Sequence, residues 1–164
     1  MNNIILNKKS TDNIIIPIIH KGNPERVGKI MTNEELHKFG LGLLIAFLNN
    51  HNGNLFQSNA NIGNEYPHLV VGSPEMELLY VWIKTEMYTT IPSILSIENH
   101  KEVIKLSTRF NAIPVFAGLR LSCISNKDKR IPFCGGSYIA EFTGFKHFEQ
   151  KSILKETKDI TRLG

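Results

Sequence analysis

The chain has 164 residues, of which 41% are hydrophobic, and this composition suits one domain with a buried core. A formal net charge of +4 is ordinary for a soluble domain and only weakly indicates a nucleic-acid partner. The longest apolar run near the N-terminus, residues 14–19, is too short to cross a membrane and is interrupted by Pro17. No signal-peptide cleavage pattern follows it. We therefore expect a cytoplasmic protein with no membrane segment.

The first part of the chain predicts an extension followed by a helix. Residues 1–31 form the N-terminal extension, in which 14–19 are a strand or a clamp onto the domain and 20–30 are a polar connector. Thr32 and Glu35 have the spacing of a capping box, and Gly53 ends the helix that it begins. The apolar and small residues of this helix form one stripe at helical spacing: Leu36, Gly40, Leu43, Leu44, Phe47 and Leu48.

Three strands are expected next, over residues 55–58, 67–71 and 78–85, with a turn at Ser73-Pro74 between the last two. The third of these strands is apolar on both faces except at Lys84, a pattern typical of a central strand covered on both sides. A second helix is expected over residues 96–110, with Ser96 as its cap and Val103, Leu106 and Phe110 facing inward.

A long strand over 113–124 follows, then a charged turn and a last strand over 137–142. The crossover through the second helix places the long strand parallel to residues 78–85. The predicted fold is therefore an α/β sandwich with a mixed sheet and helices packed on it. One domain spans 32–145, and 146–164 are a polar tail.

Cys123 and Cys134 do not have the spacing of metal ligands. Free buried thiols are the expected state in a reducing cytoplasm, and a disulfide stays open because the two residues could meet across a hairpin.

The element order, with YPHLVV at 66–71 before the turn and LLYVWIKTE at 78–86 after it, resembles the restriction-endonuclease-like fold of the PD-(D/E)xK nucleases. The resemblance covers roughly residues 32–125 and implies an αβββαβ core with a mixed central sheet flanked by helices. In that family a Pro-Asp pair opens the second strand. The third strand carries an acidic residue, one spacer and a lysine, and the first helix often adds a glutamate.

The match to this motif is partial. Pro67, Lys84 and Thr85 agree with the family pattern. His68 stands where the metal-binding aspartate belongs, and Trp82 stands where the second acidic residue belongs. The resemblance therefore implies a degenerate site made of His68, Trp82, Lys84 and the helix glutamate, which is Glu35 or its neighbour Glu34.

The chemistry of phosphodiester hydrolysis gives these departures their meaning. Mg²⁺ is a hard cation that requires oxygen ligands, and it activates water and neutralises charge on the phosphate. Histidine and tryptophan supply no carboxylate, so we expect neither a cofactor nor a metal. A Mg²⁺ site is expected only if an acidic residue of another element takes the place of the missing carboxylate. Glu98 is this alternative acid, because it lies on the predicted second helix, which follows the strand of Lys84.

Each residue of the degenerate site also has a structural interpretation. We interpret His68 as a partly buried, hydrogen-bonded histidine, because the sequence offers no second zinc ligand near it. Trp82 reads as a core residue, with stacking on a ligand ring as the alternative. Lys84 has three open interpretations: it snorkels to solvent, pairs with an acid such as Glu35, or lines a cleft.

Three functions follow from these interpretations. The first is a non-catalytic binding or scaffold module, with nucleic acid and a second copy of the chain as candidate partners. The second is a divergent metal-dependent nuclease that uses Lys84 with Glu98 or Glu35. The third is a small-molecule binding domain around Trp82 and Lys84.

Overall fold

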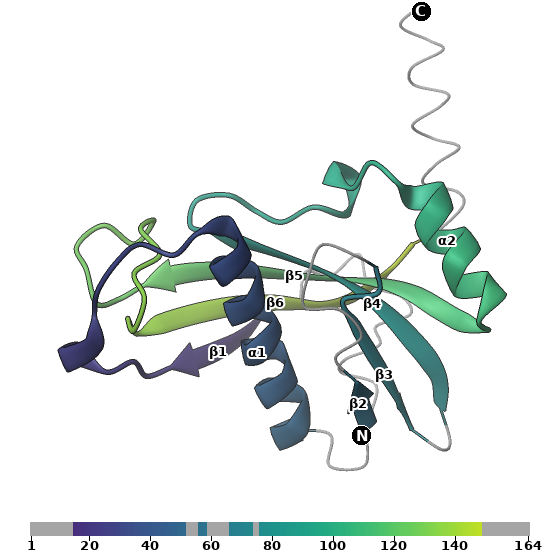
Figure 1. Cartoon of the computed structure of the whole chain (residues 1–164), viewed down its shortest axis with the longest axis horizontal. Coiled ribbons are helices and arrows are strands. Elements are labelled where there is room, and N and C mark those ends of the chain that lie inside the picture. The colour runs from purple at the N-terminus through teal and green to yellow at the C-terminus, as the bar shows by residue number, and fades with distance from the viewer. Residues whose placement is uncertain (1–14, 52–55, 59–65, 74–75, 149–164) are drawn as a thin grey trace, which may run out of the picture.

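The computed structural model describes residues 15–51, 56–58, 66–73 and 76–148 (Figure 1). Within these ranges six strands form one sheet in the order β1-β6-β5-β4-β3-β2. The strands are β1 (Ile16–His20), β2 (Phe56–Ser58), β3 (Leu69–Ser73), β4 (Met76–Met87), β5 (Ala112–Cys123) and β6 (Tyr138–His147). The helices are α1 (Asn33–His51), α2 (His100–Arg109) and two short 3-10 turns, Pro24–Arg26 and Ile94–Ser96. The predicted mixed α/β class is confirmed.

The centre of the sheet is a parallel pair formed by β4 and β5. The chain leaves β4, passes through α2 and returns along β5, and the cross-strand pairs include Trp82 with Phe116 and Lys84 with Gly118. The other described strand pairs are antiparallel. The parallel pairing predicted from the crossover through the second helix is therefore confirmed.

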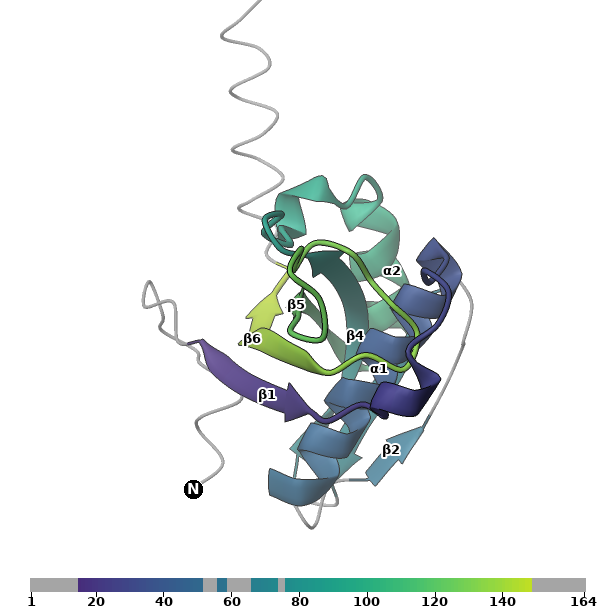
Figure 2. The same cartoon turned by 90° about the vertical axis from the view of Figure 1, so that its left-hand side faces the viewer.

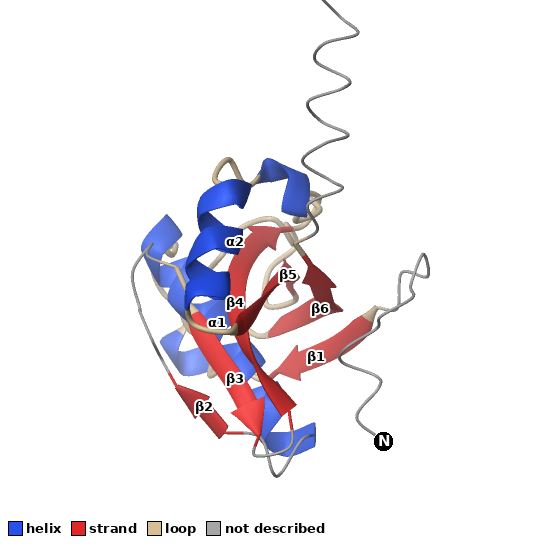
Figure 3. Cartoon of the chain, turned by 90° about the vertical axis from the view of Figure 1, so that its right-hand side faces the viewer, coloured by secondary structure: helices blue, strands red, loops and turns tan. Residues whose placement is uncertain are grey.

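The two edges of the sheet are formed by its shortest pieces. Figure 2 shows β1 at one edge beside β6, where Ile16 lies opposite Phe142 and His20 opposite Tyr138. Figure 3 shows β2 at the other edge beside β3. The run at residues 14–19 is thus a strand of the sheet over its described part.

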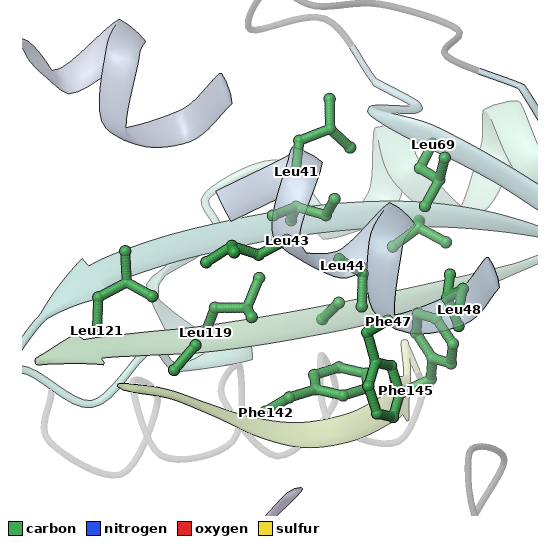
Figure 4. Packing of buried hydrophobic residues seen from close by; sticks show 14 of the residues in the cluster. Leu41, Leu43, Leu44, Phe47, Leu48, Leu69, Leu119, Leu121, Phe142 and Phe145 are labelled. Carbon is green, nitrogen blue, oxygen red and sulfur yellow. The ribbon is translucent and has the colours of Figure 1, made fainter. Parts of the chain in front are cut away.

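Alternate residues of β4 face different helices, as the period of a strand requires. Leu79, Val81 and Ile83 belong to the main core under α1, together with residues of β5 and β6 (Figure 4). Trp82 belongs to a smaller cluster on the opposite side of β4, with Val103 of α2. Each helix therefore covers its own part of the sheet.

The capping box predicted for α1 is confirmed. The Thr32 amide donates to Glu35 Oε2 at 2.8 Å, and the Glu35 amide donates to Thr32 Oγ1 at 3.2 Å. The apolar stripe that follows is buried, including Leu44 and Leu48. Gly40 lies directly against Thr85 of β4, because a Cβ at that glycine would fall 1.9 Å from Thr85 Oγ1.

The start of the second helix was predicted too early. The structure begins α2 at His100 with Asn99 as N-cap, while Ser96 ends a separate 3-10 turn capped by Ser93. The Ser96 hydroxyl donates to the Ser93 carbonyl within that turn and so does not cap a helix. Phe110, expected to face inward, is 52% exposed because it lies just beyond the end of the helix.

The last strand is longer than predicted. β6 continues to His147, and the Phe148 amide donates to the Pro114 carbonyl at 3.2 Å. Phe148 is buried in the cluster around α2, so the first residues assigned to the polar tail belong to the sheet and its packing. The remaining tail from 149, residues 1–14, Gly53 and Glu65 lie outside the described residues.

Both cysteines are free thiols, Cys123 buried and Cys134 partly exposed. Of the helices in the described ranges, none has the length and apolar character needed to cross a membrane.

Candidate functional site

Lys84 and Trp82 project from the same face of β4, as predicted from their spacing. The Lys84 side chain is 43% exposed, and its ammonium lies 3.7 Å from Glu86 Oε1 on the same strand. Lys84 therefore snorkels to solvent beside a neighbouring acid. The interpretation that Lys84 pairs with an acid agrees with this contact, but the acid is Glu86 and not Glu35, which binds Thr32 and the Lys29 ammonium at the start of α1.

His68 is buried, with 3% of its surface exposed, just before β3. Its amide donates to the Val81 carbonyl at 3.0 Å, and its Nδ1 accepts the Ile83 amide at 2.9 Å. In the neutral ring this assigns the proton to Nε2. The predicted hydrogen-bonded histidine agrees with this geometry, since one ring nitrogen is already occupied by the backbone of β4.

Trp82 lies in a group of aromatic rings. Its ring stacks on Tyr66 at a centroid distance of 5.8 Å and an interplanar angle of 25°. The His68 ring lies 5.0 Å from it on another side. Trp82 is only partly buried, so it is neither a fully enclosed core residue nor an open platform. Offset aromatic contacts of this kind stabilise beyond the area they bury.

Tyr66 connects this group to α2. Its hydroxyl donates to the Tyr80 carbonyl at 2.9 Å and lies 2.7 Å from Ser107 Oγ. Burial raises the pKa of the Tyr66 phenol well above its ordinary value. The hydroxyl is therefore a neutral structural group that joins β4 to α2.

His37 extends the group toward α1. Its ring meets the His68 ring edge-on with centroids 4.6 Å apart. Burial lowers the pKa of His37, and its buried Nε2 has no hydrogen-bond partner among the described residues. Four rings thus run from α1 across the end of β3 to the side of the sheet covered by α2: His37, His68, Trp82 and Tyr66, named below as the aromatic string.

Glu98, the alternative acid, lies exposed before the first turn of α2 and makes no ion pair with Lys84 among the described residues. Within the described ranges no three histidine, cysteine or acidic side chains are grouped as metal ligands. The site thus provides stacked rings and one half-exposed ammonium group.

Two members of the aromatic string were missed from the sequence. Tyr66 immediately precedes Pro67. An aromatic residue at this position was the feature of the sequence that could have assigned Tyr66 to the site. His37 lies between Leu36 and Lys38 in the helix, where nothing in the helical pattern distinguishes it from a solvated residue.

A second polar surface lies on the exposed side of α2. Lys101, Lys105 and Arg109 recur every fourth residue, so they form one ridge with about 6 Å of helix rise between neighbours. None of the three is ion-paired with a described residue, whereas Lys29, Lys38, Lys84, Arg120 and Arg130 are each paired with a carboxylate. The Arg109 guanidinium also lies over the exposed ring of Phe110, at 5.8 Å.

The fold and the site define a mixed α/β domain with aromatic rings beside a lysine on its central strand. Residues 34–148 match the model of a family described as Domain of unknown function (DUF8840), and the chain belongs to this family. The matched range includes every described strand except β1. No curated protein and no solved structure matches the chain.

Proposed function

We propose that this chain is a non-catalytic binding module with a restriction-endonuclease-like core. The observation that carries the proposal is the aromatic string, because two of its members, His68 and Trp82, are the residues that the resemblance aligns with the carboxylates of a PD-(D/E)xK nuclease. His68 and Trp82 are packed against Tyr66 and His37, so these positions serve to join the helices to the sheet.

The connectivity supports the fold part of this proposal. The sequence of elements α1, β2, β3, β4, α2, β5 is that of an αβββαβ core, with β2, β3 and β4 antiparallel and β5 parallel to β4. In this frame β6 and β1 extend the sheet beyond β5.

The chemistry of the donor set supports the non-catalytic part. A hard divalent cation requires several oxygen ligands, and Glu86 is the one acidic residue paired with Lys84 among the residues that the structure describes. Glu35 is committed to the helix cap and to Lys29. An isolated ammonium group neither activates water nor replaces the charge of a metal ion.

The ridge of Lys101, Lys105 and Arg109 is the surface that we assign to the partner, and a nucleic-acid strand is the partner whose charge it fits. Cations at regular spacing that pair with no described carboxylate suit a chain of phosphates, and the exposed Phe110 ring offers a stacking surface at the end of the ridge. Glu102 lies on the same helix, so the more positive part of the ridge is its C-terminal half.

Metal binding tests the non-catalytic part. Calorimetric titration with Mn²⁺ and Mg²⁺ should give no saturable binding, and DNA should not be cleaved in either metal. The double variant His68→Asp/Trp82→Glu restores both acids, so it should gain Mn²⁺ binding if these positions correspond to the nuclease site. Circular dichroism checks that the variant folds.

Metal-dependent cleavage by the native chain that is lost in Lys84→Ala would instead establish the divergent nuclease. A folded double variant that binds no Mn²⁺ would contradict the assignment of the two positions.

Oligonucleotide binding tests the partner surface. Fluorescence anisotropy with labelled single-stranded and duplex DNA should give binding that weakens steeply with salt. Lys105→Ala/Arg109→Ala should reduce affinity about tenfold or more, since two phosphate contacts are lost. The matched control Lys127→Ala/Lys129→Ala removes the same charge from the turn between β5 and β6 and should have little effect. Equal losses in both variants, or no binding by the native chain, would exclude the ridge as a specific surface.

A further inference from the structure

Two cysteines lie near the point where β5 ends and β6 begins. Cys123 is the last residue of β5, is fully buried, and lies opposite Tyr138, the first residue of β6. Cys134 lies on the turn that leads into β6 and is partly exposed. This arrangement has no part in the proposed binding function and does not depend on it.

The surroundings of Gly136 place these groups together. A Cβ at Gly136 would fall 3.2 Å from the Phe133 carbonyl oxygen, 3.3 Å from Cys123 Sγ and 3.4 Å from the Tyr138 ring. The Tyr138 hydroxyl donates to that same carbonyl oxygen, which belongs to the residue before Cys134. The Cys123 sulfur, the Tyr138 ring and the peptide leading into Cys134 therefore surround one glycine.

The electrostatics of Tyr138 agree with this geometry. Burial raises the pKa of the Tyr138 phenol, and the thiolate forms of Cys123 and Cys134 raise it further.

The backbone holds Cys134 beside a cation. The Cys134 amide donates to the Lys29 carbonyl at 2.8 Å, and the Gly28 amide donates to the Cys134 carbonyl at 3.0 Å. The pKa of Lys29 is raised first by its hydrogen bond and attraction to Glu35 and then by attraction to the Cys134 thiolate.

We propose that Cys123 and Cys134 are a peroxide-oxidisable pair of thiols, in which the accessible Cys134 reacts first and the buried Cys123 resolves it. The Cys134 thiolate attacks one oxygen of hydrogen peroxide, the O–O bond breaks, and the departing hydroxide takes a proton to become water. Cys134 is then a sulfenic acid. The Cys123 sulfur attacks the Cys134 sulfur, an S–S bond forms, the S–O bond breaks, and the hydroxide leaves as water with the thiol proton of Cys123. The two thiols lose two electrons in all, and the peroxide gains them.

The pairing ties the end of β5 to the turn before β6 and, through the Cys134 backbone, to the connector at Gly28 and Lys29. The oxidised chain should therefore resist unfolding better than the reduced chain.

Mass spectrometry of the full chain tests the proposal. Treatment with hydrogen peroxide, then alkylation under denaturing conditions, should give a product that has lost the mass of two hydrogen atoms and carries no alkyl group. Cys123→Ser should stop at a sulfenic acid on Cys134 that dimedone traps. Cys134→Ser, which changes a partly exposed position and should fold, should leave Cys123 as an alkylatable thiol.

Lys29→Gln should slow the oxidation of Cys134 severalfold, because it removes the neighbouring cation. The matched control Lys38→Gln breaks another exposed ion pair at α1, with Glu34, and should leave the rate unchanged. The proposal is overturned if both thiols of the peroxide-treated native chain remain alkylatable. It is also overturned if Cys134 accumulates as sulfinic acid while Cys123 stays reduced, or if the disulfide forms only between two chains.

Discussion

His68 shows how a buried imidazole is held in place by a backbone amide and by neighbouring rings. One ring nitrogen accepts a hydrogen bond from a backbone amide of β4. The ring also contacts the rings of His37 and Trp82, which lie on opposite sides of the sheet. A ring held in this way acts as packing between elements.

Trp82→Ala should lower the free energy of unfolding by roughly 3 kcal/mol, the low end of the range for a buried aromatic residue, because Trp82 is only partly buried. Urea denaturation measures the change. Trp82→Phe keeps an aromatic ring against Tyr66 and should cost clearly less. Equal losses in the two variants would mean that the stacked contact contributes little.

The geometry of Trp82 and Lys84 was predictable because a strand of period two fixes which residues share a face. The position of Tyr66 was not, because it precedes β3 in a segment without periodicity, and its contacts with Tyr80 and Ser107 join residues far apart in the chain. The pairing of Lys84 with Glu86 was missed for a related reason: a flexible side chain selects among several acids within reach.

His37 should make stability depend on pH. Its pKa is lowered by burial from an ordinary value of 6.5, so the unfolded chain takes up a proton at a higher pH than the folded chain. The contribution of His37 is therefore complete above about pH 6.5 and is lost as the pH falls below it. Neighbouring groups are His68, whose ring lies edge-on at 4.6 Å, and Glu34 and Lys38 on the same helix.

Urea denaturation between about pH 7.5 and pH 5 measures this dependence. His37→Gln should flatten the curve in the acid half of that window. Lys38→Gln changes the charge of α1 nearby without removing a histidine and should leave the slope as it is. An unchanged slope in His37→Gln would assign the dependence to other groups.

At the scale of the elements, the start of α1 depends on residues close together in the sequence, whereas one of its glycines is required by a contact with the sheet. The start of α1 was predictable because Thr32 and Glu35 satisfy each other's amides, which needs no other part of the chain. The role of Gly40 emerges only from the fold, since Thr85 lies against it from β4.

Gly40→Ala and Gly42→Ala form a matched pair within α1. Alanine at Gly42 meets no atom within 4 Å, so it should stabilise the chain by about 1 kcal/mol through helix propensity. Alanine at Gly40 would lie 1.9 Å from Thr85 Oγ1 and 2.9 Å from Thr85 Cβ, so it should destabilise by about 1–3 kcal/mol. Thermal unfolding compares the two, and Thr85→Ala should recover part of the loss at Gly40. Stabilisation by both substitutions would show that α1 is free to move away from β4.

The bounds of the second helix could not be predicted from capping residues and spacing alone. Ser93 and Ser96 are both good caps, and the sequence does not decide which of them begins an element or where the 3-10 turn gives way to α2. Phe110 fits the inward spacing of α2, but the helix ends before it, so its ring turns outward.

For the whole molecule, the exposed edge of the sheet is the feature that needs protection. β1 is an edge strand with Pro17 at its second position, and proline has no amide to offer a neighbouring strand. Pro17→Val should increase self-association, detected as dimers or larger species by sedimentation velocity, because the edge regains a donor. Adding Ile19→Lys at the exposed Ile19 should reverse the effect. If the native chain, Pro17→Val and the double variant sediment equally, Pro17 does not protect the edge against self-association.

The pairing of β1 with β6 also sets an order of events during synthesis. Ile16 leaves the ribosome long before Phe142, its partner across the sheet, so the first strand must wait unpaired while nearly all of the domain is made. The family match begins after β1, and the buried residues of the main core lie between α1 and β6. This part of the chain therefore contains its own core before β1 completes the sheet. A nascent chain arrested before residue 138 should therefore leave its N-terminal strand open to proteases, and release of the finished chain should protect it.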